Sequence, residues 1–264
     1  DDRFAMVSHN EFPNAYYLDQ LSIRTYLDYS PIDSDTPAGA YKLLYISIPT
    51  AFSIWNSGDA ENIENLSDDR LAALGFHTRA QIAELAQQAP GSHWYVMGEP
   101  NRYPGVTGAR FAPVWHYYYT QLTNADPTAI VTSPSLLNWD FTCLGCSGGA
   151  LCEGVFHRGY LCGKVWAKDF IARYDFLYGE KPPIDVWTID VYPIDWLRIP
   201  NNAELHAPIV TQQLESMRQY LDTIPEYRNT PIWITEVAIH AGYDGIDRSA
   251  LPRVVPVGDY NWDL

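Results

Sequence analysis

The sequence predicts an α/β barrel of the TIM (β/α)8 type, and three observations lead to that prediction. The chain has 264 residues, which is the size of one such barrel. Hydrophobic residues make up 47% of it, enough for a large core. Short apolar runs alternate with longer segments of helical period, and this alternation is typical of α/β layering.

Seven short apolar runs are the expected strands, at residues 4–7, 23–29, 43–48, 94–97, 129–133, 186–191 and 232–235. A closed barrel needs an eighth strand, and an unpaired sheet edge is a liability. We therefore expect the natural chain to run beyond Leu264. No internal repeat or linker interrupts the sequence, so residues 1–264 are expected to form a single barrel domain.

Helices are expected between the later strands. Apolar side chains recur at helical spacing over residues 82–89, where Thr78 can cap the helix and Pro90-Gly91 ends it. Further helices are expected at residues 111–122, 166–177 and 210–221. The first half of the chain is less regular.

The charge of the chain limits its partners. It carries 17 basic and 32 acidic residues, a formal net charge of −15. Nucleic acids and anionic membranes would be repelled, and acidic polysaccharides are disfavoured for the same reason. The charge does not disfavour a neutral oligo- or polysaccharide as the partner. The aromatic content of 14% suits the C–H faces and hydroxyls of sugars. We expect a monomer.

All four cysteines fall in one glycine-rich segment, as Cys143, Cys146, Cys152 and Cys162. Their spacing fits either two disulfides or a zinc site, but a second Cys-x-x-Cys pair is missing, which favours disulfides. Disulfides and an acidic, lysine-poor composition are typical of a secreted or cell-surface protein. Because the chain opens on Asp1-Asp2-Arg3, any signal peptide has been removed or was never present.

Two glutamates follow apolar strands directly. Glu99 ends the run from Trp94, and Glu236 ends the run from Pro231. In a barrel, catalytic side chains project from the C-terminal ends of strands, and core packing gives no reason for a charge there. Rim glutamates in surface salt bridges are the alternative for either residue alone.

This pair resembles the clan A retaining glycoside hydrolases, in which an acid/base Glu ends the fourth strand, usually as Asn-Glu-Pro, and a nucleophile Glu ends the seventh. Glu99-Pro100-Asn101 and Thr235-Glu236 match those two sites. In detail the chain is similar to the small β-1,3-glucanase-like barrels, on the segment from Pro90 to Trp94. The resemblance implies double displacement, with Glu236 as nucleophile, Glu99 as general acid/base and no cofactor.

The same resemblance implies a neutral β-glucan substrate, β-1,3-linked and cleaved internally. Residues on the strand-end loops are expected to bind it: Asn101, Asn138, Trp139, Asp190, Tyr192, Trp196 and His240. Tyr192 would also donate to Glu236.

The chain departs from the clan pattern at two positions. Gly98 replaces the usual Asn, which in the clan donates to the sugar 2-hydroxyl, and Asp190 replaces a His. Asp190 would hold a neighbouring Tyr or His, bind a sugar hydroxyl, or raise the pKa of Glu99 by like-charge repulsion. Two alternatives remain open: a carbohydrate-binding barrel that has lost catalysis, and a metal-dependent hydrolase with zinc on the cysteines.

Overall fold

The computed structural model describes residues 5–8, 25–28, 41–140, 161–192 and 206–237. Every strand pair in this part of the chain is parallel. One sheet has the order β1 (Ala5–Ser8), β2 (Thr25–Asp28), β3 (Tyr41–Ile46), β4 (His93–Val96) and β5 (Ile130–Val131). The other has the order β6 (Leu136–Leu137), β7 (Trp187–Val191) and β8 (Ile232–Val237). All seven expected strands are confirmed.

The predicted fifth strand, at residues 129–133, is shorter than expected and is followed by a second strand in the other sheet. Pro134, which has no N–H to donate, separates β5 from β6. Isolated parallel bridges join Gly98 to Ser135 and Thr132 to Val186, so the two sheets follow one another across this break. The α/β class is confirmed. In the described residues the sheets do not close, so the complete barrel stays a prediction.

All four expected helices are confirmed, as α4 (Arg79–Gln88), α5 (Gly108–Ala125), α6 (Gly163–Tyr178) and α7 (His206–Asp222). Thr78 and Gln81 form a capping box at the start of α4. The segment after β3 also contains α2 (Phe52–Asn56), a 3₁₀ helix (Ala60–Asn65) and α3 (Asp68–Leu74), which the sequence analysis did not single out. None of the helices in the described part of the chain is long and apolar enough to cross a membrane.

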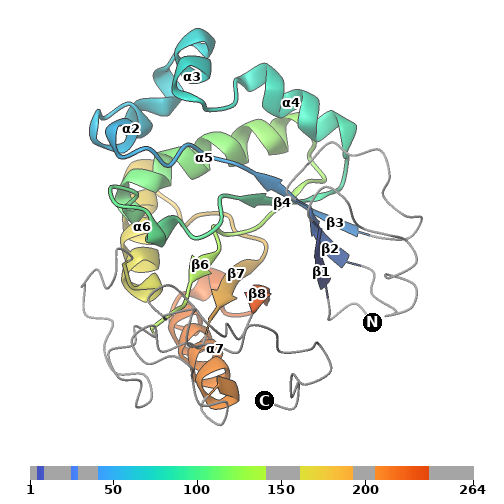
Figure 1. Cartoon of the computed structure of the whole chain (residues 1–264), viewed down its shortest axis with the longest axis vertical. Helices are drawn as coiled ribbons and strands as arrows, with labels where there is room; N and C mark the ends of the chain where they lie inside the picture. Colours follow the sequence, from blue (N-terminus) through green and yellow to red (C-terminus); the bar gives the residue numbers. More distant parts are fainter. Residues whose placement is uncertain (1–4, 9–24, 29–40, 141–160, 193–205, 238–264) are drawn as a thin grey trace, which may run out of the picture.

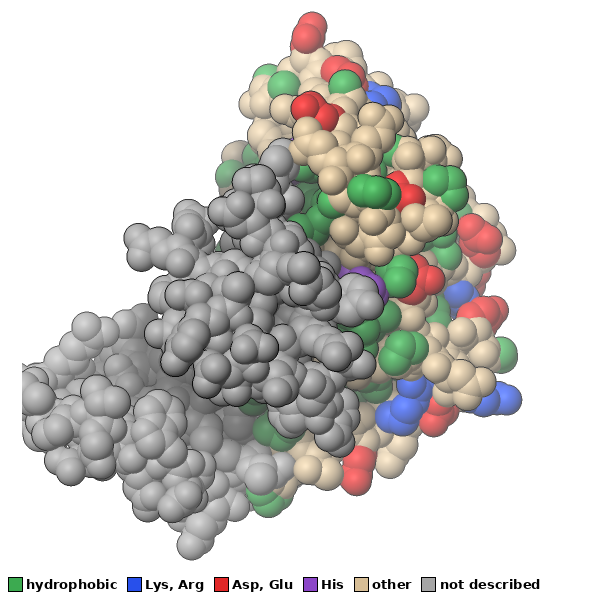
Figure 2. Space-filling model, turned by 90° about the vertical axis from the view of Figure 1, so that its right-hand side faces the viewer, with side chains coloured by type: hydrophobic (Ala, Val, Ile, Leu, Met, Phe, Trp, Pro, Cys, Tyr) green, Lys and Arg blue, Asp and Glu red, His purple; other side chains and the backbone are tan. Residues whose placement is uncertain are grey.

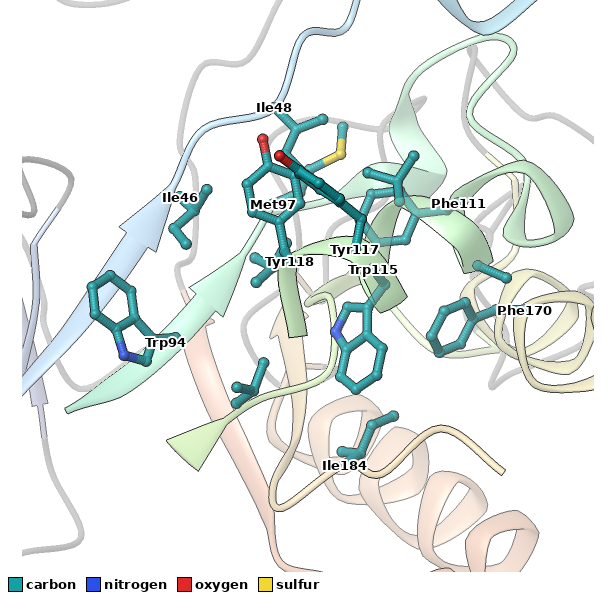
Figure 3. Close-up of a cluster of buried hydrophobic side chains, with 14 of the residues drawn as sticks. Ile46, Ile48, Trp94, Met97, Phe111, Trp115, Tyr117, Tyr118, Phe170 and Ile184 are labelled. Atoms are coloured by element: carbon teal, nitrogen blue, oxygen red, sulfur yellow. The ribbon is translucent and has the colours of Figure 1, made fainter. Parts of the chain in front are cut away.

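Most of the core lies between the sheets and the helices that cover them (Figure 1). Figure 3 shows side chains of β3 and β4, such as Ile46 and Trp94, beside Trp115 of α5 and Phe170 of α6. A smaller cluster on the opposite side of the first sheet consists of Leu27, Leu43 and Tyr95, with Tyr45 packed against it. The hydroxyl group of Tyr95 contacts a group of buried polar residues, which is described below.

The loop after β4 is anchored by one buried amide. Asn101 is fully buried; its Nδ2 donates to the backbone oxygens of Leu137 (2.9 Å) and Leu161 (2.7 Å), and its Oδ1 accepts from Leu137 N (2.9 Å). These bonds connect the loop that carries Glu99 to β6 and to the start of α6. Figure 2 shows Asp and Glu side chains spread over the described part of one face of the molecule, in keeping with the net charge.

We expect Asn101→Ala to lower the free energy of unfolding by about 2–4 kcal/mol, because it removes the amide that bonds the buried N–H and C=O of Leu137 and the partly buried C=O of Leu161. Urea denaturation measures this, with Asn124→Ala on the exposed end of α5 as the control, expected within about 0.5 kcal/mol of the wild type. Equal stabilities for the two variants would contradict the anchoring role.

Helices α5 and α6 cross at Gly108. A Cβ atom there would lie 2.2 Å from the backbone oxygen of Trp166 and 2.5 Å from the backbone nitrogen of Phe170, so only glycine permits this approach. We expect Gly108→Ala to destabilise the protein by at least about 1–3 kcal/mol through overpacking, measured by urea denaturation. A stability equal to the wild type would show that the two helices can separate at no cost.

Candidate active site

The backbone turns sharply between β4 and Glu99. Met97 and Glu99 have left-handed conformations, with φ of 63° and 49°, which are unfavourable for side chains of this size. Two hydrogen bonds hold the turn: Met97 N donates to Ile46 O (3.1 Å), and Glu99 N donates to Ser135 O (2.8 Å). Glu99 is therefore fixed relative to β3 and to the start of β6.

Glu236 is placed by an irregularity in β8. Ile189 of β7 pairs with Ile234, but the next residue, Asp190, pairs with Glu236, so Thr235 is an extra residue on β8. The Oγ1 of Thr235 donates to Asp190 Oδ1 at 2.6 Å. The irregularity thus sets both Thr235 and Glu236 beside Asp190.

These two backbone devices bring three carboxyl groups together at the C-terminal ends of the strands. One oxygen each of Glu99, Asp190 and Glu236 lies within 4.8 Å of the others. Asp190 is fully buried, whereas Glu99 and Glu236 are partly buried. Glu99 and Glu236 thus lie close together, as expected from their positions in the sequence.

The surroundings of the two glutamates differ. Burial raises the pKa of Glu99, and the Arg102 guanidinium, 3.1 Å from Glu99 Oε2, opposes that rise. The hydroxyl of Tyr192 donates to Glu236 Oε2 at 2.6 Å, as the sequence analysis expected. Burial and this bond raise the pKa of Tyr192, which stays a donor. Glu99 is suited to hold a proton, and Glu236 is held as an acceptor.

Asp190 lies among hydroxyl groups from three other segments. Its Oδ1 accepts from Ser135 (2.8 Å) and Thr235 (2.6 Å), and its Oδ2 accepts from Tyr95 (3.2 Å). Burial raises its pKa well above the ordinary value, and the charges of Glu236 and Glu99 add to this. Of the roles considered for Asp190, the structure shows the holding of a tyrosine. With a fully buried side chain it does not face a sugar, which corrects that expectation.

Three carboxylates at this spacing could in principle hold a cation. Both oxygens of Asp190, however, already accept hydrogen bonds from hydroxyl groups, and a cation on the same oxygens would repel those protons. The donor set therefore suits a cluster of carboxyl groups that share protons better than a metal site.

Three residues expected to bind substrate have other places in the structure. Asn101, Asn138 and Trp139 are fully buried. Asn101 holds its loop, and Asn138 Oδ1 accepts from the backbone of Tyr192 (2.9 Å) and from Gln213 (3.3 Å). Trp139 packs on Tyr220 with 5.6 Å between ring centroids. We therefore correct the expectation that they contact a sugar: they are structural residues.

Other expectations lie outside the described residues, namely Trp196, His240, Cys143, Cys146 and Cys152. Cys162 is described: it lies buried directly before α6 and is not a free thiol. The disulfide arrangement stays a prediction.

Sequence reasoning missed several residues around the glutamates: Tyr95, Arg102, Ser135 and Thr235. Arg102, three residues after Glu99, offered a signal by its spacing alone. Thr235 offered another, as a polar residue inside an apolar strand. Ser135 and Tyr95 gave none, because a hydroxyl after a strand and a Tyr within one are common.

No family model and no curated protein matches the sequence. Among solved structures, the chain is similar to a GH128 (subgroup I) endo-β-1,3-glucanase from Amycolatopsis mediterranei, crystallised in complex with laminaritriose. The identity is 15% and the TM-score 0.50, and the match covers 97% of this chain and 76% of that one. At this identity the similarity concerns the fold alone.

Proposed function

We propose that the protein is a retaining glycoside hydrolase that cleaves a neutral β-glucan, β-1,3-linked, at internal bonds. The observation that carries this proposal is the approach of Glu99 and Glu236, whose nearest carboxyl oxygens lie within 4.8 Å. Retaining enzymes place the two carboxyl groups about 5–5.5 Å apart, whereas inverting enzymes leave about 6.5–9.5 Å for a water molecule. The short separation favours direct attack by a carboxylate.

In the first step, an oxygen of ionised Glu236 attacks the anomeric carbon while protonated Glu99 gives its proton to the departing glycosidic oxygen. A glycosyl-enzyme ester forms and one saccharide leaves. In the second step, Glu99 takes a proton from water, whose oxygen displaces Glu236 from the sugar. Glu99 ends protonated and Glu236 ionised. The bond from Tyr192 stabilises Glu236 as a carboxylate before the first step and after the second.

Two observations support the substrate class. The fold is similar to that of an endo-β-1,3-glucanase crystallised with laminaritriose. The net charge of −15 opposes the approach of uronic-acid polymers and leaves neutral glucans unaffected. We propose that the protein works outside the cell, as a monomer.

The first test is hydrolysis of laminarin, with barley glucan, mannan, xylan and cellulose as comparison substrates. We expect laminarin to give short oligosaccharides, separated by chromatography, whose new reducing ends are first formed as the β-anomer in proton NMR. Activity on mannan or xylan alone would refute the linkage. Sugar binding without release of product would favour the non-catalytic barrel.

The second test separates the roles of the glutamates. Glu236→Gln should lose hydrolysis of all substrates, whereas Glu99→Gln should lose about 10²–10⁴-fold on laminarin and much less on a glucoside whose leaving group needs no proton. Glu215→Gln, exposed on α7, is the matched control and should act like the wild type. Equal losses on both substrates for Glu99→Gln would contradict its role as general acid.

The third test uses Arg102. Activity requires protonated Glu99 and is lost as the pH rises through its pKa, which Arg102 lowers. Arg102→Met should therefore move the alkaline limb of the kcat/KM profile to higher pH. Arg110→Met is the control, since Arg110 contacts Asn56 and Glu61 instead, and should leave the limb in place. An alkaline limb that moves to lower pH in Arg102→Met would contradict the assignment.

A further inference from the structure

The carboxyl group of Asp190 ties together the segments that carry the two glutamates. It is hydrogen-bonded to Ser135, whose backbone oxygen accepts from Glu99 N, and to Thr235, the neighbour of Glu236. It also accepts from Tyr95 of β4. One fully buried side chain of β7 thus contacts residues of β4 and β8 and the residue before β6.

The number of protons available for hydrogen bonds around Asp190 indicates whether its carboxyl group is ionised. Asp190 Oδ1, Ser135 Oγ and Thr235 Oγ1 form a triangle with sides of 2.8, 2.6 and 2.6 Å. Each side is a hydrogen-bond distance between oxygens and needs a proton on it, but the two hydroxyls supply one proton each. A carboxylate leaves one side without a proton. A carboxylic acid supplies the third.

The charges around Asp190 lead to the same conclusion. The ionisable groups that face it are Glu99 and Glu236, with three tyrosines: Tyr45 of β3, Tyr95 of β4 and Tyr192 directly after β7. Arg102 pairs with Glu99 instead. An ionised Asp190 would be a fully buried anion beside two further carboxyl groups, which is strongly unfavourable.

We propose that Asp190 is a positioning residue that works as an uncharged carboxylic acid. It fixes the backbone on both sides of the cluster and leaves Glu236 as the anion that attacks the sugar. This inference rests on the proposed function for its catalytic part, whereas the protonation of Asp190 can be measured without any activity.

The kinetic test compares two substitutions. An amide at position 190 is uncharged, as the neutral acid is; its nitrogen can donate to the hydroxyls of Ser135 and Thr235, where the acid donates one proton, and its oxygen can accept from Tyr95. Asp190→Asn should therefore keep kcat/KM on laminarin within about tenfold, with both limbs of the pH profile in place. Asp190→Ala should lose at least about 10²-fold, since both glutamates lose their anchor. Asp222→Asn, exposed on α7, is the control.

An ionised Asp190 would give a different pH profile. If Asp190 were ionised in the working enzyme, its charge would raise the pKa of Glu99, and Asp190→Asn would move the alkaline limb to lower pH. That shift, or a loss in Asp190→Asn as large as in Asp190→Ala, would overturn the proposal.

The spectroscopic test needs no substrate. In Glu99→Gln, infrared spectroscopy at neutral pH should show the C=O band of a protonated carboxyl group, and this band should vanish when Asp190→Asn is added. Should that double variant not fold, Thr235→Val serves instead, because losing its hydroxyl must shift the band. Absence of the band, or a band that neither change affects, would refute the neutral state. If the wild type showed no hydrolase activity, but Glu99→Gln still gave a band that vanished with Asp190→Asn, the proposed function would be contradicted and the state of Asp190 supported.

Stability gives a second check on the protonation. Since the pKa of Asp190 is raised above its ordinary 3.8 by folding, the folded protein holds a proton that the unfolded chain releases. This stabilisation is fully present below the ordinary pKa and is lost as the pH rises through the folded one. In urea denaturation, the free energy of unfolding of Asp190→Asn should rise relative to that of the wild type as the pH increases above the ordinary aspartate pKa of 3.8. A constant difference would contradict the proposal.

Discussion

The site depends on one constraint: three carboxyl groups share a space in which they cannot all be ionised. One oxygen of each lies within 4.8 Å of the others, and the cation Arg102 is paired with Glu99. Like charges this close in a partly buried place raise one another's pKa, so the surroundings decide which group keeps a proton. Burial raises the pKa of Asp190 and of Glu99, and the hydroxyl of Tyr192 donates to Glu236.

The irregularities of the backbone follow from bringing these groups together. A regular strand end would not set Glu99 against Ser135, and a regular β7–β8 ladder would set Thr235 in place of Glu236 opposite Asp190. Two left-handed residues and a bulge are unfavourable locally, by about 1–3 kcal/mol for each strained residue. The large aromatic core between sheet and helices, together with the bonds of Asn101, stabilises these conformations.

The sequence predicted what depends on periodicity and missed what depends on geometry across strands. Alternating apolar runs located seven strands, and helical spacing located four helices, because both patterns are local. The position of Glu99 and Glu236 after apolar strands was enough to predict that they meet, since parallel strands end on one edge. The pattern could not show that Thr235 is an extra residue in its ladder, nor that Asn101, Asn138 and Trp139 point inward. Such facts depend on pairing between distant segments.

The two departures from the clan A pattern, Gly98 and Asp190, are linked because both positions lie beside the hydroxyl of Tyr95. A Cβ atom at position 98 would lie 3.0 Å from the hydroxyl oxygen of Tyr95, closer than nearly all such contacts. That hydroxyl donates to Asp190 and is held by it. A larger residue at position 98 would push the Tyr95 hydroxyl away and leave Oδ2 of the buried acid without its donor. A side chain at position 190 that could not accept would leave the Tyr95 hydroxyl without this partner. Glycine at the strand end and an acid on β7 are thus coupled through one tyrosine, so neither can be exchanged alone without disturbing the other.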